Sequence, residues 1–269
     1  MPAIQIERLV QQISSILAPA SPGPIFRENF KSLLEVHANL AYRAGMEIQR
    51  KSLIPKYHLA PIVIHQIQHH LILFTKNNPE LALEYADHLW GENLFEMKYF
   101  SAVILGSMPN EKEEEVLKRF LNWGPITTEK EIYEILFRYG SQSFIQASSN
   151  KWLNTIQAWI DSSQTTQVIT AIYALQSLIH DPSFQNLPRV FKIITPLFSI
   201  NNRKITSGIL ILIEDLAEIN PVETAHYLSY LLLTSSSTNP KKIIRKSLKS
   251  FPIAEQEKLR IALSNAPED

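Results

Sequence analysis

Apolar residues recur every three or four positions along almost the whole chain, the spacing that places them on one face of an α-helix. Ile6, Leu9, Ile13 and Leu17 follow it near the N-terminus, and residues 169–179 follow it again. No stretch has the convincing alternation of a β-strand, so we predict an all-α protein. The predicted helices cover residues 3–18, 25–51, 59–76, 79–90, 93–107, 111–122, 128–139, 141–148, 150–161, 165–180, 184–198, 203–219, 221–235, 239–250 and 253–264.

Four predicted helix starts share one sequence pattern, an Asn or Asp followed by proline. Such a pair combines a capping residue with a φ that already suits the first helical turn. The pairs begin at Asn78, Asp181, Asn220 and Asn239, and the last three lie about 39 and 19 residues apart, which fits the helix-pair period of about 40 residues in HEAT repeats. We predict an α-solenoid of HEAT-like antiparallel helix pairs, an armadillo-type superhelix. It would form a single domain over 1–269, with 1–55 as N-terminal capping helices.

Composition narrows the possible chemistry. The chain has only 7 glycines among its 269 residues and no cysteine. Because cysteine is absent, disulfides, thiolate nucleophiles and cysteine metal sites are excluded, and a reducing compartment fits. The N-terminus lacks the uninterrupted apolar core of a signal peptide, and the longest apolar runs are shorter than a membrane span. We expect a soluble, cytoplasmic protein that binds neither a membrane nor a cofactor.

Three histidines in one predicted helix form the best candidate metal site. His65 and His69 are four residues apart, as are zinc-binding histidines on a helix, and His70 follows them. The metalloprotease pattern requires a glutamate after the first histidine, and the chain has Gln66 there. A polar helix face is the favoured interpretation, and we predict no metal.

The net charge argues against nucleic-acid binding, whereas the local distribution of charge is compatible with it. Lys plus Arg and Asp plus Glu both number 26, whereas nucleic-acid binders usually carry a basic excess. One predicted helix nevertheless collects basic residues opposite an apolar face. This is the best candidate phosphate-binding stripe, although a solvated helix face is favoured on the pattern alone. The stripe comprises Lys241, Lys242, Arg245, Lys246 and Lys249, and a second, equally ambiguous group comprises Arg43, Arg50, Lys51 and Lys56.

Four tryptophans are candidates for stacking on unpaired bases, although at helical spacing aromatic residues more often belong to a core. Trp152 and Trp159, seven residues apart, predict one buried face. Trp123 precedes Gly124 and Pro125 at a predicted helix end, and we expect it to be the most exposed of the four, which also include Trp90.

Several segments resemble one known family. Residues 81–106 resemble the "L-W-x-x-x-x-x-E-x-x-x-x-A-x-x-x-L" helix pair of the AlkD-like DNA alkylation repair family, residues 150–180 resemble its "W-L-x-S … A-I-x-x-L" pair, and Ile244-Arg-Lys-Ser-Leu248 resembles its "I-R-K-A-I" helix. The resemblance covers about residues 55–265 and implies a HEAT-like fold. It also implies duplex DNA as the partner and a glycosylase that removes alkylated bases with a carboxylate, an arginine and two tryptophans.

Most of those functional positions carry different residues in this chain. The family's "N-W-x-x-x-D" motif falls on Asn122 to Thr127, so Trp123 has a counterpart while the acid is replaced by Thr127. The arginine falls on Ile169, and the second tryptophan falls on Ser250. A slip of the alignment would restore an acid at Glu129 or Glu131, which are therefore weak catalytic candidates.

Three functions remain open. The first is non-catalytic binding of duplex DNA on the concave face by Trp123 and the basic stripe. The second is a non-enzymatic scaffold that takes a protein or peptide in its groove. The third and least favoured is excision of N-alkylpurines with Glu129 or Glu131 as a relocated acid.

Overall fold

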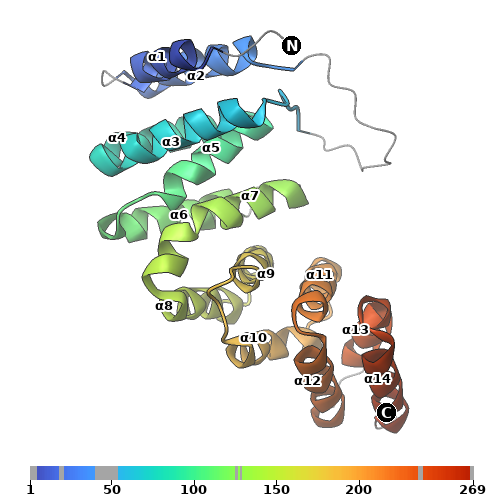
Figure 1. Cartoon of the computed structure of the whole chain (residues 1–269). Helices are drawn as coiled ribbons and strands as arrows, with labels where there is room; N and C mark the ends of the chain where they lie inside the picture. Colours follow the sequence, from blue (N-terminus) through green and yellow to red (C-terminus); the bar gives the residue numbers. More distant parts are fainter. Residues whose placement is uncertain are drawn as a thin grey trace. The chain divides into compact units, whose positions relative to one another are not determined.

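The computed structural model describes residues 5–17, 21–39, 54–124, 127, 129–235 and 239–266. All regular structure among these residues is helical (Figure 1), so the predicted all-α class is confirmed. The chain divides into two compact units, Met1–Ala147 and Ser148–Asp269. No helix in the described ranges has the length and apolar character needed to cross a bilayer.

The first unit contains most of the helices that the apolar spacing predicts. These are α1 (Ile6–Leu17), α2 (Gly23–Val36), α3 (Pro61–Asn77), α4 (Pro79–Trp90), α5 (Phe95–Gly106), the 3-10 helix η1 (Asn110–Lys112), α6 (Glu113–Trp123) and α7 (Lys130–Gly140). The predicted helix 25–51 is wrong in extent, because α2 ends at Val36 and 37–39 are not helical. The rest of that prediction lies outside the described residues.

Helices of the first unit pack in two rows (Figure 1). Helices α1, α3, α5 and α7 follow one another in the first row, and α2 packs beside α4 in the second. Two ion pairs join α4 to the η1–α6 segment: Glu80 with Lys112, and Asp87 with Arg119. Helix α5 contacts α3 and α7 in its own row and α4 in the other, which explains why it is buried almost all round rather than on one face.

A glycine permits a close approach between α5 and α7. A Cβ atom added to Gly106 would lie 1.8 Å from the carbonyl oxygen of Tyr139. Backbone atoms cannot move aside as a flexible side chain can, so this position requires the absence of a side chain. Gly106 therefore sets how closely α7 lies against α5.

The segment before α3 is tied to α2, α5 and α7. Glu96, only 5% exposed, accepts hydrogen bonds on Oε1 from the amides of Tyr57 and His58, both at 2.9 Å. The hydroxyl of Tyr57 donates to Glu35 at 3.0 Å, and Lys56 pairs with Glu131. His58 takes a positive φ of 51°, a conformation that non-glycine residues adopt only where neighbouring contacts hold it.

The second unit continues from α8 (Gln142–Asp161), a single helix that begins in the first unit. The sequence predicted two helices there, 141–148 and 150–161, and this division is wrong. The unit then contains α9 (Thr165–Ile179), α10 (Leu187–Ile194), the 3-10 helix η2 (Thr195–Ser199), α11 (Arg203–Ile219), α12 (Pro221–Thr234), α13 (Asn239–Ser247), the 3-10 helix η3 (Leu248–Ser250) and α14 (Ile253–Asn265).

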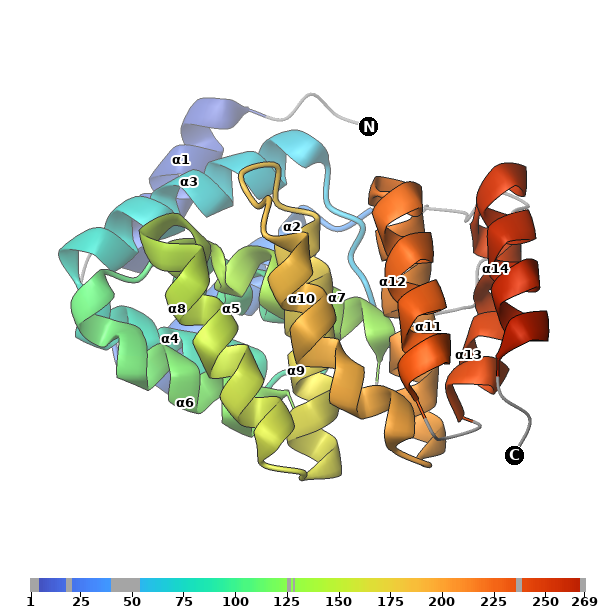
Figure 2. The ribbon, with the colours of Figure 1, turned by 90° about the horizontal axis from the view of Figure 1, so that it is seen from below.

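Helices of the second unit also pack in neighbouring pairs (Figure 2). Helix α9 lies against α11, α11 against α12 and α13, and α12 against α14. The expected tryptophan face is confirmed, because Trp152 and Trp159 are both buried and meet edge to face with centroids 5.4 Å apart. Asn239 fixes the start of α13 by donating to the carbonyl oxygens of Phe198 and Ile200.

Proline marks three of the four predicted helix starts correctly. Helices α4 and α12 begin at Pro79 and Pro221, and α13 begins at Asn239. The fourth is wrong: Asp181 instead accepts the amide of Ser183 at 2.9 Å in a turn. Helix α10 begins at Leu187. Asn186 caps it, because its side-chain oxygen accepts a hydrogen bond from the Arg189 amide at 3.3 Å.

Candidate functional site

The basic stripe occupies one side of α13 and the 3-10 turn that follows it. Ile243 and Ile244 are fully buried and anchor the helix against the second unit. The intervening basic side chains point away from this core: Lys242, Arg245, Lys246 and Lys249 are exposed and Lys241 is half-buried. The sequence therefore predicted the two faces of this helix correctly.

The exposed cations of α13 are not neutralised within the described part of the chain. No described carboxylate forms an ion pair with Lys242, Arg245, Lys246 or Lys249. Lys246 is four residues after Lys242, and Lys249 is three and four residues after Lys246 and Arg245, which places all four on one helix face about 10 Å long. Four such cations can contact successive phosphates of a nucleic-acid backbone.

Only Lys56 of the second basic group lies among the described residues. Lys56 is paired with Glu131, and its ammonium lies 4.3 Å from the centre of the Phe95 ring. Arg43, Arg50 and Lys51 lie outside the described residues. The candidate surface therefore rests on α13.

Trp123 is the most exposed of the four tryptophans, as expected, yet its ring still lies in the interior. Its side chain is 7% exposed and stacks on Trp90, with ring centroids 4.6 Å apart and planes inclined by 8°. Trp123 shares the inward face of α6 with Val116 and Phe120, at the i, i+4, i+7 spacing of one helical stripe. A base cannot reach a ring covered in this way.

Lys98 closes the other side of the tryptophan pair. Its ammonium lies 4.7 Å from the centre of the Trp90 ring and donates to the Trp90 carbonyl oxygen at 2.7 Å. Burial lowers the pKa of Lys98, and the negative charge of Glu92 partly offsets this effect. The cation is thus engaged in holding α4 and α5 together.

Of the two weak catalytic candidates, Glu131 is engaged in an ion pair and Glu129 is not capped to its helix. Glu131, in the first turn of α7, is held by Lys56. Glu129 precedes α7 and is half-buried, but its side chain forms no cap with the helix amides. Thr127, at the position that the resemblance aligns with the family's carboxylate, donates its hydroxyl hydrogen to the Trp123 carbonyl oxygen at 2.8 Å.

The other two positions that the resemblance assigns to functional residues lie in the second unit. Ile169 lies on α9, where the resemblance places an arginine, and Ser250 lies in η3, where it places a tryptophan. The histidine cluster also lacks a further ligand, since no three His, Asp or Glu side chains of the described residues gather in metal-binding geometry. His70 instead uses its Nδ1 atom in a 2.8 Å contact with the Gln66 carbonyl oxygen.

A comparison with protein families decides the relationship. A family model described as DNA alkylation repair enzyme matches residues 30–251. The chain belongs to this DNA alkylation repair family. No curated protein and no solved structure matches the chain.

The family match includes both the region around Trp123 and the basic stripe of α13. It extends from within α2 to the residue after η3, and so includes Trp123, Thr127 and the whole basic stripe of α13. This DNA alkylation repair family member therefore combines the family's helical scaffold with a buried tryptophan and a hydroxyl at two of the aligned functional positions.

Sequence reasoning missed a groove in the first unit. It lies between α3 and the α7–α8 junction, has a volume of about 640 Å³, and is lined by uncharged polar and apolar residues in similar numbers together with one lysine. The only signal in the sequence is the four-residue spacing of Gln68, Ile72 and Lys76 on α3 and of Gln142 and Gln146 on α8. Such spacing is common on exposed helix faces, so it did not identify the groove.

Proposed function

We propose that this DNA alkylation repair family member binds duplex DNA through the cationic face of α13 and does not excise bases. The observation that carries the proposal is the row of exposed cations at Lys242, Arg245, Lys246 and Lys249, unpaired with any described carboxylate. Membership of a DNA-repair family supports DNA as the anionic partner.

The cations favour the DNA backbone over the base edges. Lysine and arginine on a helix side contact phosphate oxygens, and these contacts fix position without reading sequence. The chain as a whole has no excess of positive charge, so the local stripe must supply the electrostatic attraction. We therefore expect binding that is moderate in strength and indifferent to sequence.

The absence of base excision rests on the altered chemistry of the aligned positions. A hydroxyl such as that of Thr127 carries no negative charge to stabilise a cationic sugar transition state. Trp123 is covered by Trp90, and Ile169 cannot replace an arginine. Glu131 is already neutralised by Lys56.

The same proposal includes the finer architecture. We expect the helix pairs of both units to be HEAT-like repeats of an α-solenoid, forming a single domain over 1–269 with 1–55 as its N-terminal cap. The lack of cysteine is consistent with the reducing compartment in which DNA lies, so we expect the protein in the cytoplasm or nucleoid.

Salt dependence of DNA binding tests the proposal. Binding of a fluorescein-labelled 20-base-pair duplex is measured by polarisation from about 50 to 200 mM salt. Neutralisation of four phosphates predicts a slope of about −3.6 for log K against log salt. Undetectable binding at about 50 mM salt would falsify the proposal.

A matched pair of charge-reversal variants locates the surface. Lys242→Glu with Lys246→Glu removes two cations from α13, and we expect the salt slope to become shallower by about 2. The control, Lys118→Glu with Lys192→Glu, makes the same charge change at exposed positions on α6 and α10. Equal effects of both variants would show that net charge, not α13, determines binding.

The non-catalytic half of the proposal has its own assay. Alkylated duplex DNA is incubated with the protein, and free 7-methylguanine and 3-methyladenine are measured by chromatography. We expect release at the background rate for the wild type. Release above background that disappears in Glu129→Gln or Glu131→Gln would instead establish a relocated acid.

A further inference from the structure

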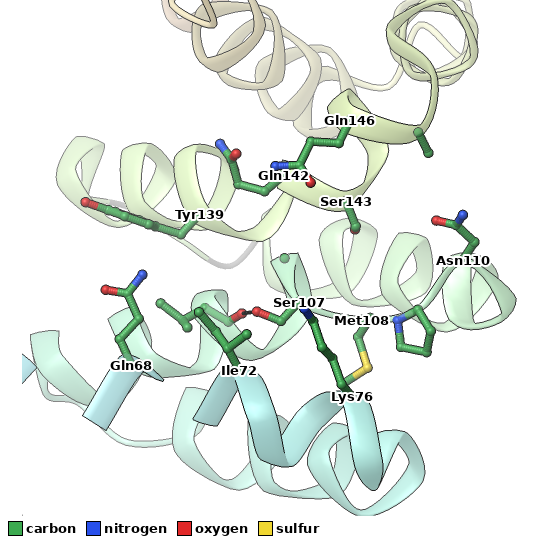
Figure 3. A pocket seen from close by; sticks show the side chains of 14 residues that line it. Gln68, Ile72, Lys76, Ser107, Met108, Asn110, Tyr139, Gln142, Ser143 and Gln146 are labelled. Atoms are coloured by element: carbon green, nitrogen blue, oxygen red, sulfur yellow. Dashed lines mark hydrogen bonds between the residues drawn. The ribbon is translucent and has the colours of Figure 1, made fainter. Parts of the chain in front are cut away.

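The groove in the first unit has two walls and a floor (Figure 3). Gln68, Ile72 and Lys76 of α3 form one wall, and Tyr139, Gln142 and Gln146 from the end of α7 and the start of α8 form the other. The floor is the C-terminal end of α5, at Val103, Gly106 and Ser107. All lining residues belong to the first unit.

The length of the groove follows from the helix repeat. Eight residues separate Gln68 from Lys76, which corresponds to about 12 Å along α3. An extended chain advances about 3.3 Å per residue. The groove therefore matches about four residues of extended polypeptide, and its volume of about 640 Å³ is sufficient for their side chains.

Hydrogen bonds within the protein orient the amides of the two walls differently. The Gln68 Oε1 atom accepts the Tyr99 hydroxyl at 3.1 Å, so the Gln68 amino group remains as a donor. The Gln142 Nε2 atom donates to the Arg138 carbonyl oxygen at 2.8 Å, so the Gln142 Oε1 atom remains as an acceptor. Gln68 thus keeps a donor on one wall, while the Gln142 amide is turned back over α7 and the Gln146 amide extends toward the groove on the other wall (Figure 3).

This arrangement complements an extended peptide backbone. Successive residues of a strand direct their N–H and C=O groups to both sides, so a peptide between these walls can donate to Gln146 and accept from Gln68. Gln146 is exposed and lines the wall opposite Gln68. Ile72 and Val103 supply apolar contact for side chains.

The charge of the groove argues against a nucleic acid. Lys76 is the only lining residue with a formal charge, whereas a backbone of phosphates requires several cations for stable binding. Lys76 lies at the same end as Asn110 and away from Tyr139 (Figure 3). A single carboxylate at that end is the group that Lys76 can recognise.

We propose that this groove binds an extended peptide segment of about four residues that is uncharged except for one carboxylate at the Lys76 end. The peptide backbone hydrogen-bonds to the glutamines of the two walls, and the carboxylate pairs with Lys76. This site is separate from the α13 surface, so it does not depend on DNA binding.

Selection of peptides tests the proposal. A phage-displayed library of random nonapeptides is selected against the full chain, and a selected peptide is labelled with fluorescein for polarisation measurements. We expect selected peptides to share an uncharged stretch of about four residues beside one Asp or Glu. Failure to select any peptide above background would overturn the proposal.

Variants of the walls connect the selected peptide with the groove. Gln146→Ala and Lys76→Glu should each raise the Kd at least about 10-fold, and both sites are exposed helix positions where the fold tolerates substitution. Lys76→Glu should regain binding when the peptide's acidic residue is changed to lysine. Gln11→Ala and Lys118→Glu, exposed residues outside the groove, are the controls and should leave the Kd unchanged.

Two further outcomes would overturn the assignment. One is a selected peptide whose Kd is indifferent to Gln146→Ala and Lys76→Glu, because it binds elsewhere. The other is a single-stranded 12-nucleotide oligonucleotide that binds in a Gln146-dependent manner while no peptide does, because the groove would then be a nucleic-acid site. Circular dichroism of each variant should match that of the wild type.

Discussion

Trp123 lies face to face on Trp90 across the contact between α6 and α4, with planes inclined by 8°. The two rings are 7% and 4% exposed, respectively. A residue that the family resemblance assigns to DNA contact is therefore part of the packing of this chain. Its substitution should affect folding before it affects any ligand.

Trp123→Ala should reduce the free energy of unfolding by about 3–5 kcal/mol, because it removes a large buried ring and leaves a cavity beside Trp90. Urea denaturation followed by circular dichroism measures this loss. Trp123→Phe retains an aromatic ring and should lose less. If Trp123→Ala abolished duplex binding while leaving the urea midpoint unchanged, the ring would contact DNA after all.

Gly106→Ala should be destabilising although alanine usually favours a helix. The added Cβ would meet the Tyr139 carbonyl oxygen at 1.8 Å, and overpacking of this kind costs about 1–3 kcal/mol. The urea midpoint should fall accordingly. Gly91→Ala is the control, since its nearest neighbour would lie at 3.6 Å and its φ is −63°, and its effect should stay within about 0.5 kcal/mol.

Alkaline pH should weaken the fold through two half-buried tyrosines. Burial raises the pKa of Tyr227 to about 12, against the small opposing effect of its hydrogen bond with Thr195. Burial and the Glu35 carboxylate raise the pKa of Tyr57 to about 12 as well. Because the folded pKa exceeds the unfolded value of about 10, the protonated tyrosines contribute stability below pH 10 that is lost as pH rises towards 12.

Urea midpoints between pH 8 and 12 measure this dependence. Tyr227→Phe should show a smaller decline above pH 10 than the wild type, although it also loses the 3.0 Å hydrogen bond with Thr195. Tyr230→Phe, at a 62% exposed position on the same helix, is the matched control. A decline as steep in Tyr227→Phe as in wild type would refute the contribution of Tyr227.

The positions of most helices could be predicted because their signals are local. Proline fixes φ at the first helical turn, so Pro79 and Pro221 mark real helix starts. The false break within α8 lies near Ser149 and Asn150, residues that favour turns when considered alone. Packing of Phe144, Trp152 and Ile156 in the core overrides that local preference.

The candidate sites were less predictable because they depend on contacts between distant residues. The α13 stripe was visible, since its cations and its buried Ile243 and Ile244 belong to one helix. The burial of Trp123 depends on Trp90, 33 positions earlier. The groove combines Gln68 with Gln142, whose proximity depends on the α5–α7 contact at Gly106.

Glu96 gives the segment before α3 an unusual form of attachment. Two successive amides that converge on one oxygen make the kind of backbone nest that other proteins use to capture free anions. In this chain the anion is the Glu96 carboxylate of α5, which accepts the hydrogen bonds from the amides of Tyr57 and His58. Because such a tethered ligand has a high effective concentration, dissolved phosphate or chloride cannot displace it, and the nest is closed to cellular anions.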